Sequence, residues 1–373
     1  MSMDDEFSPL SPMSNPDLVG HEDTEKALLD AITTGRMHHA WLITGPRGIG
    51  KATMAYRLAR YLSAHPQGPA DEASGGLFGE DLPQESPSSL YVSPEHSSFG
   101  PIANNAHPAV RTIKRSYNEK TKKMRSEIVV DDVRALNSFF SMTAGDGEWR
   151  VAIVDGAEEM NNNAANALLK TLEEPPRRSL IILVSHAPGR LLPTIRSRTR
   201  QLVMKPLAND QVTDVLSRLF PDMDPGERMA LSQLSDGAPG RAVRLAASGG
   251  LDAYQHVLAL LGQLPKIGTD SFHQVLTDIG GRGKEAHYDI YLDLMLGWIS
   301  NMVRAAACHT LPAPILGGEP ALAQKLLSIA GLEPWLEVWE KMTKLTARGE
   351  AVNMDHRQIL AVLMNNLEKL ARA

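Results

Sequence analysis

The sequence predicts a parallel α/β domain that is followed by a region built only of helices. An apolar run, AWLITG (40–45), leads into a glycine-rich loop and then into the helical spacing of KATMAYRLARYL (51–62). Two more apolar runs, at 151–155 and 179–186, alternate with helical patterns, and beyond Lys205 no strand pattern remains. Strands that alternate with helices are typical of a doubly wound α/β domain.

The elements up to residue 62 follow from their apolar spacing. In EDTEKALLDAITTGR (22–36), apolar residues recur at intervals of three and four, which predicts a helix. The run at 40–45 is short, continuously apolar and bounded by glycine, so we predict a buried strand there. The order strand, glycine loop and helix is the context that a phosphate-binding loop requires.

Composition changes after this first group of elements. Residues 64–108 are rich in proline, glycine and serine and show no sustained period, which predicts a long insertion or a disordered loop. The stretch PAVRTIKRSYNEKTKKMRSE (108–127) is strongly basic. It is interpreted as a solvated surface, and the alternative is a local contact with a phosphate backbone or an acidic partner.

Further elements complete the predicted α/β domain. EIVVDDVRALNSFFSM (127–142) is predicted as a short strand followed by a helix. VAIVD (151–155) and SLIILVSH (179–186) are apolar at successive positions, as expected of parallel strands that are covered on both faces. Between them, NNNAANALLKTLEEPP (161–176) is predicted to be a helix, with an asparagine cap at its start and two prolines at its end.

The remaining chain is predicted to be helical. Residues from about 208 to 250 suggest small helices that are broken at proline and glycine, and helical spacing continues from there to Ala373. Cys308 is the single cysteine of the sequence, so an internal disulfide and a Cys–x–x–Cys zinc site are both excluded. We expect Cys308 to be a buried residue of this helical region.

The overall composition is that of an ordinary globular chain of 373 residues, with 43% apolar and 22% charged residues. A formal net charge of −6 does not favour DNA binding by the molecule as a whole. Residues 1–15 are acidic and rich in proline and serine, which predicts a flexible tail and no signal peptide. Since no apolar run approaches the length of a membrane span, we expect a cytoplasmic protein.

The loop GPRGIGKATM (45–54) contains most parts of a nucleotide site. Glycines let backbone N–H groups point towards a phosphate, and a lysine neutralises its charge. The candidate nucleotide-binding residues of this loop are Gly45, Gly48, Gly50 and Lys51. Ala52 stands where a hydroxyl should bind Mg²⁺, and Thr53 lies about 100° further round the helix. The sequence leaves open whether Thr53 replaces that hydroxyl.

A second part of the nucleotide site stands at the end of the strand at 151–155. Asp155 could hold Mg²⁺ through water, as in other P-loop enzymes. The next residue, where a glutamate would polarise the attacking water, is Gly156, and Glu158 is expected on the approach to the following helix. Loss of these electrostatic groups should slow hydrolysis strongly. We therefore predict ATP or ADP binding without rapid hydrolysis, Mg²⁺ only together with nucleotide, and no zinc.

Four segments resemble bacterial DNA polymerase III clamp-loader subunits of the AAA+ family. They are VGHE (19–22), GRMHHAWLITGPRGIGKAT (35–53), NNNAANALLKTLEEPPRRSLIILVSHAPGRLLPTIRSRTR (161–200) and GAPGRAVRL (237–245). The resemblance is dense over 15–62 and 127–245 and weak in the final third of the chain. Degenerate nucleotide motifs beside an intact Ser-Arg motif resemble the delta-prime type more than the ATP-hydrolysing gamma/tau type.

This resemblance implies a subunit of a ring-shaped complex that loads the sliding clamp onto primed DNA, with gamma/tau-type and delta-type subunits as partners. It also implies the domain organisation. A flexible tail (1–15) precedes an AAA+ P-loop domain (16–207), a small helical lid domain (208–250) and an all-α oligomerisation collar (251–373). Such a subunit is part of the DNA-directed DNA polymerase holoenzyme, and we expect it to have no intrinsic ATPase activity.

The resemblance also implies roles for single residues. Arg198 of the Ser-Arg motif would project into the ATP site of a neighbouring subunit as an arginine finger, and Ser197 would orient its loop. Ser185 and His186 match the first sensor region. Arg241 is the candidate for the second sensor.

This sequence departs from the family pattern at three places. Gly240 stands where active relatives carry the second-sensor arginine, so Arg241 lies one place late. Thr199 replaces the cysteine that usually follows the arginine finger. The family's four-cysteine zinc module has no counterpart in 64–127.

Two other functions remain as alternatives to this non-catalytic subunit. One is an ATP-hydrolysing gamma/tau-type or other AAA+ motor subunit, in which Thr53 would bind Mg²⁺. The other is a nucleic-acid-binding module that uses residues 111–125. The acidic total charge and the lack of interleaved aromatic residues argue against that module as the main role.

Overall fold

The computed structural model describes residues 11–66, 88–118, 123–141, 149–279, 285–351 and 354–372. These residues fall into two compact units. One is Met1–Leu219 with Asp236–Arg241, and the other is Phe220–Ser235 with Ala242–Ala373. Residues 1–10 of the predicted tail and 67–87 of the predicted insertion lie outside the described residues. The division into a P-loop domain, a lid and a collar stays a prediction.

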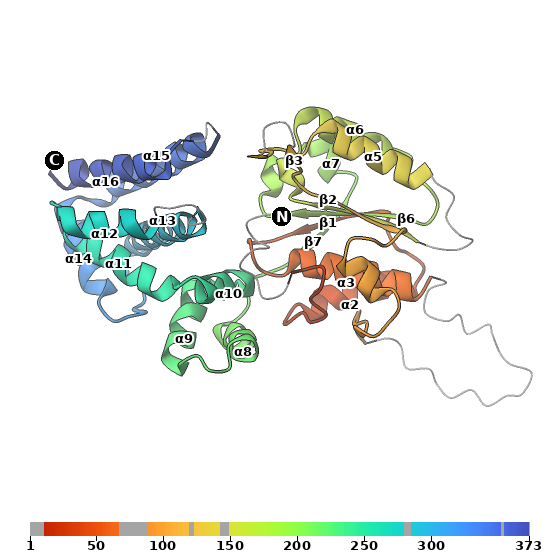
Figure 1. Ribbon diagram of the computed structural model, residues 1–373, viewed down its shortest axis with the longest axis horizontal. Coiled ribbons are helices and arrows are strands. Elements are labelled where there is room, and N and C mark those ends of the chain that lie inside the picture. Colours follow the sequence, from red (N-terminus) through yellow and green to blue (C-terminus); the bar gives the residue numbers. More distant parts are fainter. Residues whose placement is uncertain are drawn as a thin grey trace, which may run out of the picture. The chain divides into compact units, whose positions relative to one another are not determined.

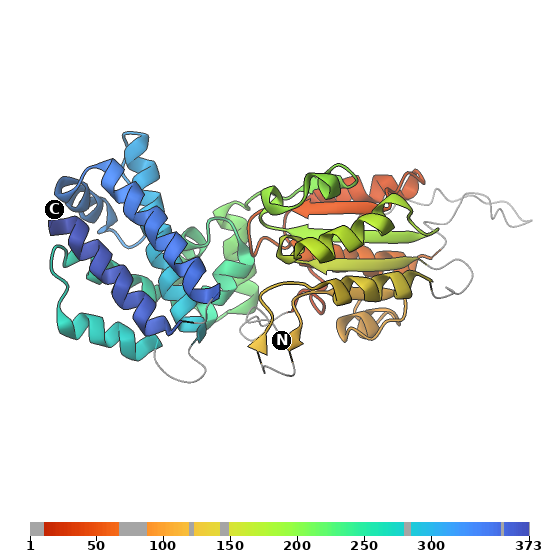
Figure 2. The same cartoon turned by 90° about the horizontal axis from the view of Figure 1, so that it is seen from above.

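The first unit contains a five-stranded sheet in the order β2-β5-β6-β1-β7. Every neighbouring pair in it is parallel. The strands are β1 (Ala40–Thr44), β2 (Val110–Ile113), β5 (Arg150–Asp155), β6 (Ser179–Ser185) and β7 (Arg200–Val203). Figure 1 shows helices on both faces of this sheet, and in the view from above the strands run side by side (Figure 2). The predicted parallel α/β fold class is confirmed.

Each face of the sheet has its own hydrophobic core, because alternate residues of a strand point to opposite faces. Trp41 and Ile43 of β1 pack with α2 (Glu22–Thr33) and α3 (Lys51–Ala64). Leu42 packs on the other face, where the cover consists of α5 (Val130–Ser141), α6 (Asn162–Glu173) and α7 (Pro193–Arg196). This double cover explains the continuous apolar runs, since Val151–Val154 of β5 are fully buried. The smaller elements are α4 (Phe99–Ala103), β3 (Tyr117–Asn118), β4 (Lys123–Met124), η1 (Ala157–Glu159), η2 (Pro188–Arg190) and α8 (Asn209–Leu219).

The described part of the predicted insertion at 64–108 is ordered, which corrects the alternative of a disordered loop for residues 88–108. Leu90 and Ile102 are buried in the core beside α3. The basic stretch that follows is not simply a solvated surface, because Val110 and Ile113 are buried in the edge strand β2. Only four residues, two of them polar, form this strand, so its pattern was too short to recognise.

The strand predicted at the start of 127–142 is reduced to a single bridge between Ile128 and Met160, and α5 then begins at Val130. The helix predicted over 161–176 is α6. Its asparagine cap is confirmed, since the Asn161 side chain accepts a hydrogen bond of 2.9 Å from the backbone N–H of Ala164.

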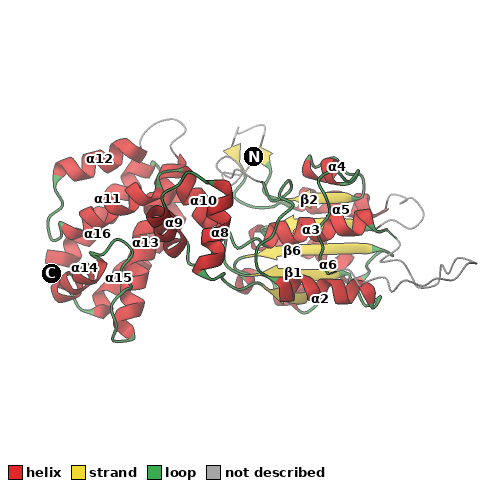
Figure 3. Cartoon of the chain, turned by 90° about the horizontal axis from the view of Figure 1, so that it is seen from below, coloured by secondary structure: helices red, strands yellow, loops and turns green. Residues whose placement is uncertain are grey.

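The second unit is helical throughout its described residues, as predicted, since no strand follows β7 in the described chain. Figure 3 draws the labelled elements of this unit as helices. Two indole N–H groups in this unit donate to backbone carbonyls, Trp335 to Leu326 at 3.0 Å and Trp339 to Leu296 at 3.1 Å. The helices are α9 (Pro225–Leu234), α10 (Pro239–Ala247), which begins in the first unit, α11 (Gly250–Gly262), α12 (Thr269–Ile279), α13 (Glu285–Ala307), α14 (Glu319–Ile329), α15 (Leu332–Ala351) and α16 (His356–Arg372).

The prediction of a buried Cys308 is wrong, because this residue is exposed. The helix α13 ends at Ala307, so Cys308 lies just beyond its last turn and outside the packed stripe that the sequence pattern suggested. Among the described residues, no helix is both long and apolar enough to cross a membrane.

Candidate nucleotide site

The predicted phosphate loop connects β1 to α3 at the carboxyl edge of the sheet. β1 ends at Thr44 and α3 begins at Lys51. Gly48 and Gly50 have φ angles of 78° and 104°, in the left-handed region that favours glycine. Gly45, at the first position of the loop, also has a positive φ. All three candidate glycines therefore have backbone conformations that residues with a side chain rarely adopt.

Other segments of the first unit approach this loop closely. The backbone N–H of Gly240 donates to the carbonyl oxygen of Gly48 at 2.7 Å. A Cβ atom on Gly45 would overlap the carbonyl group of Met204. From the amino-terminal side, Nε2 of His21 lies 3.1 Å from the carbonyl oxygen of Ile49. The glycines are thus needed for close packing as well as for loop conformation.

Lys51 is buried with a 6% exposed fraction and contacts the carbonyl groups of its own loop. Its Nζ donates to Gly45 O at 2.8 Å and to Pro46 O at 2.5 Å. Burial lowers the pKa of Lys51 to about 8, although the carboxylates of Glu158 and Asp155 act in the opposite direction. Carbonyl oxygens therefore hold the ammonium group within the loop, and the charges of the two carboxylates favour its protonated form.

Glu158 is a site residue that the sequence pattern did not indicate. It lies in η1 before α6, as expected, but only 1% of its side chain is exposed. Its Oε1 lies 2.7 Å from Nδ1 of His186 and accepts a hydrogen bond of 3.1 Å from the His186 backbone N–H. Burial alone would raise the pKa of Glu158, but hydrogen bonds from the His186 side chain, from its own backbone, from the Ser185 side chain and from the His186 backbone bring it down to about 2. The sequence signal was only an acid three places beyond a strand end.

The first turn of α3 places its two small residues differently. Thr53 is buried, with 7% exposed, whereas Ala52 is half-buried. A role of Thr53 in binding Mg²⁺ stays a prediction. No group of three or more His, Cys, Asp or Glu side chains in the described part of the chain could hold a metal ion.

The sensor candidates lie at two separate positions. Ser185, the last residue of β6, is fully buried, and its hydroxyl accepts a hydrogen bond of 3.2 Å from the Ala187 N–H. His186 contacts Glu158, whose charge raises the pKa of Lys51. The Arg241 guanidinium forms an ion pair of 2.6 Å with Asp236, while its backbone lies against Gly48.

Arg198 does not join this cluster. It follows α7, which packs on the face of the sheet opposite α3. Its Nη2 lies 2.8 Å from Oε1 of Glu173 and its Nη1 donates to Thr194 O at 3.1 Å. The Ser197 hydroxyl donates to the same Thr194 carbonyl group at 3.1 Å. The exposed fraction of the Arg198 side chain is 37%.

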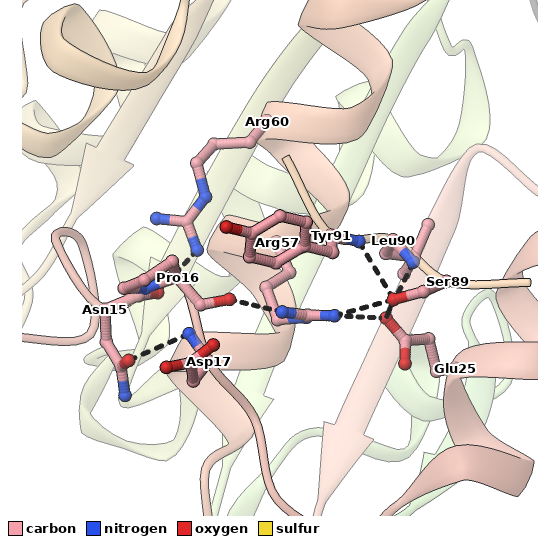
Figure 4. Close-up of polar contacts among 9 residues, drawn as sticks. All are labelled: Asn15, Pro16, Asp17, Glu25, Arg57, Arg60, Ser89, Leu90 and Tyr91. Carbon is pink, nitrogen blue, oxygen red and sulfur yellow. Dashed lines mark hydrogen bonds and ion pairs between the residues drawn. The ribbon is translucent and has the colours of Figure 1, made fainter. Parts of the chain in front are cut away.

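The helix that carries Lys51 is anchored by two buried arginines, which we call the arginine clasp (Figure 4). Arg60 donates to Met13 O at 2.8 Å and to Asn15 O at 2.7 Å. Arg57 donates to Oε1 of Glu25 at 2.6 Å. The clasp therefore fastens the amino-terminal segment and α2 to α3.

Ser89 and Leu90, which lie within the predicted insertion at 64–108, contact the same clasp. Arg57 also donates to the Ser89 hydroxyl at 3.1 Å, and Glu25 accepts the Leu90 N–H at 2.7 Å. No sequence pattern indicates the clasp, because its partners are distant along the chain.

The strand β1 of the parallel sheet leads into a glycine-rich loop, and the helix after this loop begins at Lys51. This arrangement defines a P-loop α/β protein. Residues 20–208 match the protein family described as DNA polymerase III, delta subunit, and the chain belongs to this family.

Individual relatives agree with this assignment. The chain is 37% identical to DNA polymerase III subunit delta' of Pseudomonas aeruginosa over 57% of its own length and 56% of that protein. It is 33% identical to subunit delta' of Escherichia coli over 60% of its length and 58% of that protein. Identity to subunit tau of Salmonella typhimurium is 27%, over 87% of this chain and 48% of that protein. The chain thus spans about half the length of the curated relatives that it matches.

Proposed function

We propose that the chain is a delta-prime-type subunit of the DNA polymerase III clamp-loader complex. In this role it supplies Arg198 as an arginine finger to the ATP site of a neighbouring subunit and hydrolyses ATP slowly or not at all. Its partners are gamma/tau-type and delta-type subunits, and it reaches the sliding clamp and primed DNA through the complex. The observation that carries this proposal is the position of Arg198, on the face of the sheet opposite the helix of its own loop.

The chemistry of Arg198 suits this role. A guanidinium group is planar, permanently charged and able to form paired hydrogen bonds with phosphate oxygens. At 37% exposure, the side chain is accessible at the surface of the first unit. An arginine on this side of the sheet is available to another subunit rather than to the loop at 45–50.

The candidate nucleotide site supports slow hydrolysis. Ala52 offers no hydroxyl to Mg²⁺, and Gly156 offers no carboxylate to an attacking water. An incoming phosphate would also have to replace the contacts of Lys51 with Gly45 O and Pro46 O. We propose weak binding of ATP or ADP, with Mg²⁺ bound only together with the nucleotide.

The names of the relatives support the choice of partners. Two of them are called subunit delta' and one subunit tau, all of DNA polymerase III. The identity is higher for the delta' proteins, which favours the delta-prime assignment over a gamma/tau-type motor. Residues 208–250 then serve as the lid and residues 251–373 as the oligomerisation collar.

The test is steady-state ATP turnover by the complex assembled with clamp and primed DNA. Arg198→Ala should lower turnover by about 10³-fold at the site that it serves, the effect typical of a lost arginine finger. Arg196→Ala is the matched control, because Arg196 is an exposed arginine of the same segment and should be replaceable without loss. Unchanged turnover with Arg198→Ala would refute the finger role. Brisk turnover by the purified chain alone, abolished by Lys51→Ala, would favour the motor alternative.

A further inference from the structure

We propose that Glu173 is a positioning residue that orders Arg198 before it meets the nucleotide of a neighbouring subunit. The inference rests on the proposed finger role of Arg198 and adds to it a second residue, at the end of α6. No motif in the sequence assigned a function to this glutamate.

The geometry fixes the guanidinium group from two directions. Glu173 is the last residue of α6, and its Oε1 contacts Nη2 of Arg198 at 2.8 Å. The carbonyl group of Thr194, in α7, accepts from Nη1 at 3.1 Å. Since the guanidinium group is rigid and planar, contacts from two helices to its two terminal nitrogens define both its position and its plane.

A contribution to the stability of the fold does not account for the ion pair between Glu173 and Arg198. The side chain of Glu173 is 50% exposed and that of Arg198 is 37% exposed, and ion pairs at such positions contribute little to folding. A carboxylate at the carboxyl end of a helix is also unfavourable next to the helix dipole. Arg198 offsets that effect, but an uncharged residue would avoid it altogether.

The pair is well suited to ordering a residue that acts elsewhere. A free arginine side chain loses much rotamer freedom when it is immobilised, and this loss weakens its interaction with a ligand. Glu173 restricts that freedom in advance. Two of the five N–H donors of the guanidinium group take part in the contacts described. Because the ion pair is exposed and weak, a more highly charged phosphate can readily replace Glu173 as the partner of Arg198.

A double-mutant cycle in the assembled complex tests this inference. Glu173→Gln keeps the size and an acceptor oxygen but removes the charge. It should lower kcat for ATP about fivefold with an unchanged KM, because the Arg198 side chain would then lose its rotamer freedom only when it meets the nucleotide. Glu174→Gln, at the adjacent exposed glutamate, should leave kcat unchanged. In the Arg198→Ala background, Glu173→Gln should have no further effect, because its action runs through Arg198.

The outcomes separate this inference from the function on which it rests. If Arg198→Ala lowers turnover and Glu173→Gln does not, the finger role stands and positioning by Glu173 is refuted. Equal losses from Glu173→Gln with and without Arg198 would show a general structural effect and would also refute it. A rise in turnover would mean that Glu173 restrains the finger instead. If Arg198→Ala has no effect, both proposals fail.

Discussion

Gly240 donates its backbone N–H to the carbonyl oxygen of Gly48 at 2.7 Å, and this bond joins the GAPGR motif to the phosphate loop. A Cβ atom on Gly48 would lie only 2.9 Å from the backbone nitrogen of Arg241. In the sequence, the loop and the second-sensor region are separate motifs. In the folded chain they are one packed structure.

Gly48→Ala should therefore lower the free energy of unfolding of the first unit. The substitution places a side chain at a φ of 78° and against the backbone of Arg241, and such strain costs about 1–3 kcal/mol. Urea unfolding monitored by circular dichroism measures the loss. Gly189→Ala is the control, because nothing lies within 4 Å of a Cβ atom there. Equal stabilities of the two variants would contradict the close packing of the loop.

The buried Lys51 should make stability rise with pH. Its pKa is about 8 in the folded chain, against a normal value of 10.5, so the unfolded chain holds this proton more tightly between these values. Stability increases with pH wherever the unfolded state binds more protons. Relative to Lys51→Met, the wild type should gain stability between pH 8 and 10.5. Parallel stability curves for the two proteins over this range would exclude the shifted pKa.

Glu158 should make the free energy of unfolding fall at acidic pH. Its pKa of about 2 lies below the normal value of 4.5, so the contribution is full above pH 4.5 and is lost as pH falls towards 2. Glu158→Gln should cost about 1.5–3 kcal/mol at pH 7, as expected for a hydrogen-bonded buried charge, and progressively less in acid. Chemical unfolding at pH 7 and pH 3 measures both values. A cost that is the same at the two pH values would show that the charge of Glu158 is not involved.

Local patterns were sufficient to predict much of the fold. The strands β1, β5 and β6 are covered on both faces, so each one appeared as a continuous apolar run. The cap at Asn161 follows from a hydrogen bond within three residues, and the positive φ angles of the loop occur at glycines that the sequence displays. Such features are visible in sequence because neighbours along the chain produce them.

Features that depend on distant partners could not be predicted. Glu158 is recognised as a site residue only through its contact with His186. Arg198, which follows α7, forms an ion pair with Glu173 at the end of α6. The edge strand β2 gains its order from pairing with β5, which its own four residues do not reveal. Nothing near Arg57 in the sequence indicated its contacts with Glu25 and Ser89.

The arginine clasp gives the last prediction, which concerns the order of the described part of the predicted insertion around Leu90. Only 5% of the Arg57 side chain and 14% of the Glu25 side chain are exposed, and the two are 2.6 Å apart. Glu25→Ala would leave the Arg57 charge buried without its carboxylate and the Leu90 N–H without its acceptor. Breaking a buried ion pair in this way costs about 3–5 kcal/mol.

Hydrogen exchange at the Leu90 amide should report this loss directly. In Glu25→Ala that amide should exchange faster, since its hydrogen bond to the carboxylate is gone, and the free energy of unfolding should fall. Asp23→Ala is the matched control, because Asp23 is an exposed acid in the same turn of α2 and its removal should change stability by no more than about 0.5 kcal/mol. Slow exchange at Leu90 in Glu25→Ala would show that the packing of Leu90 in the core, rather than the clasp, orders this segment.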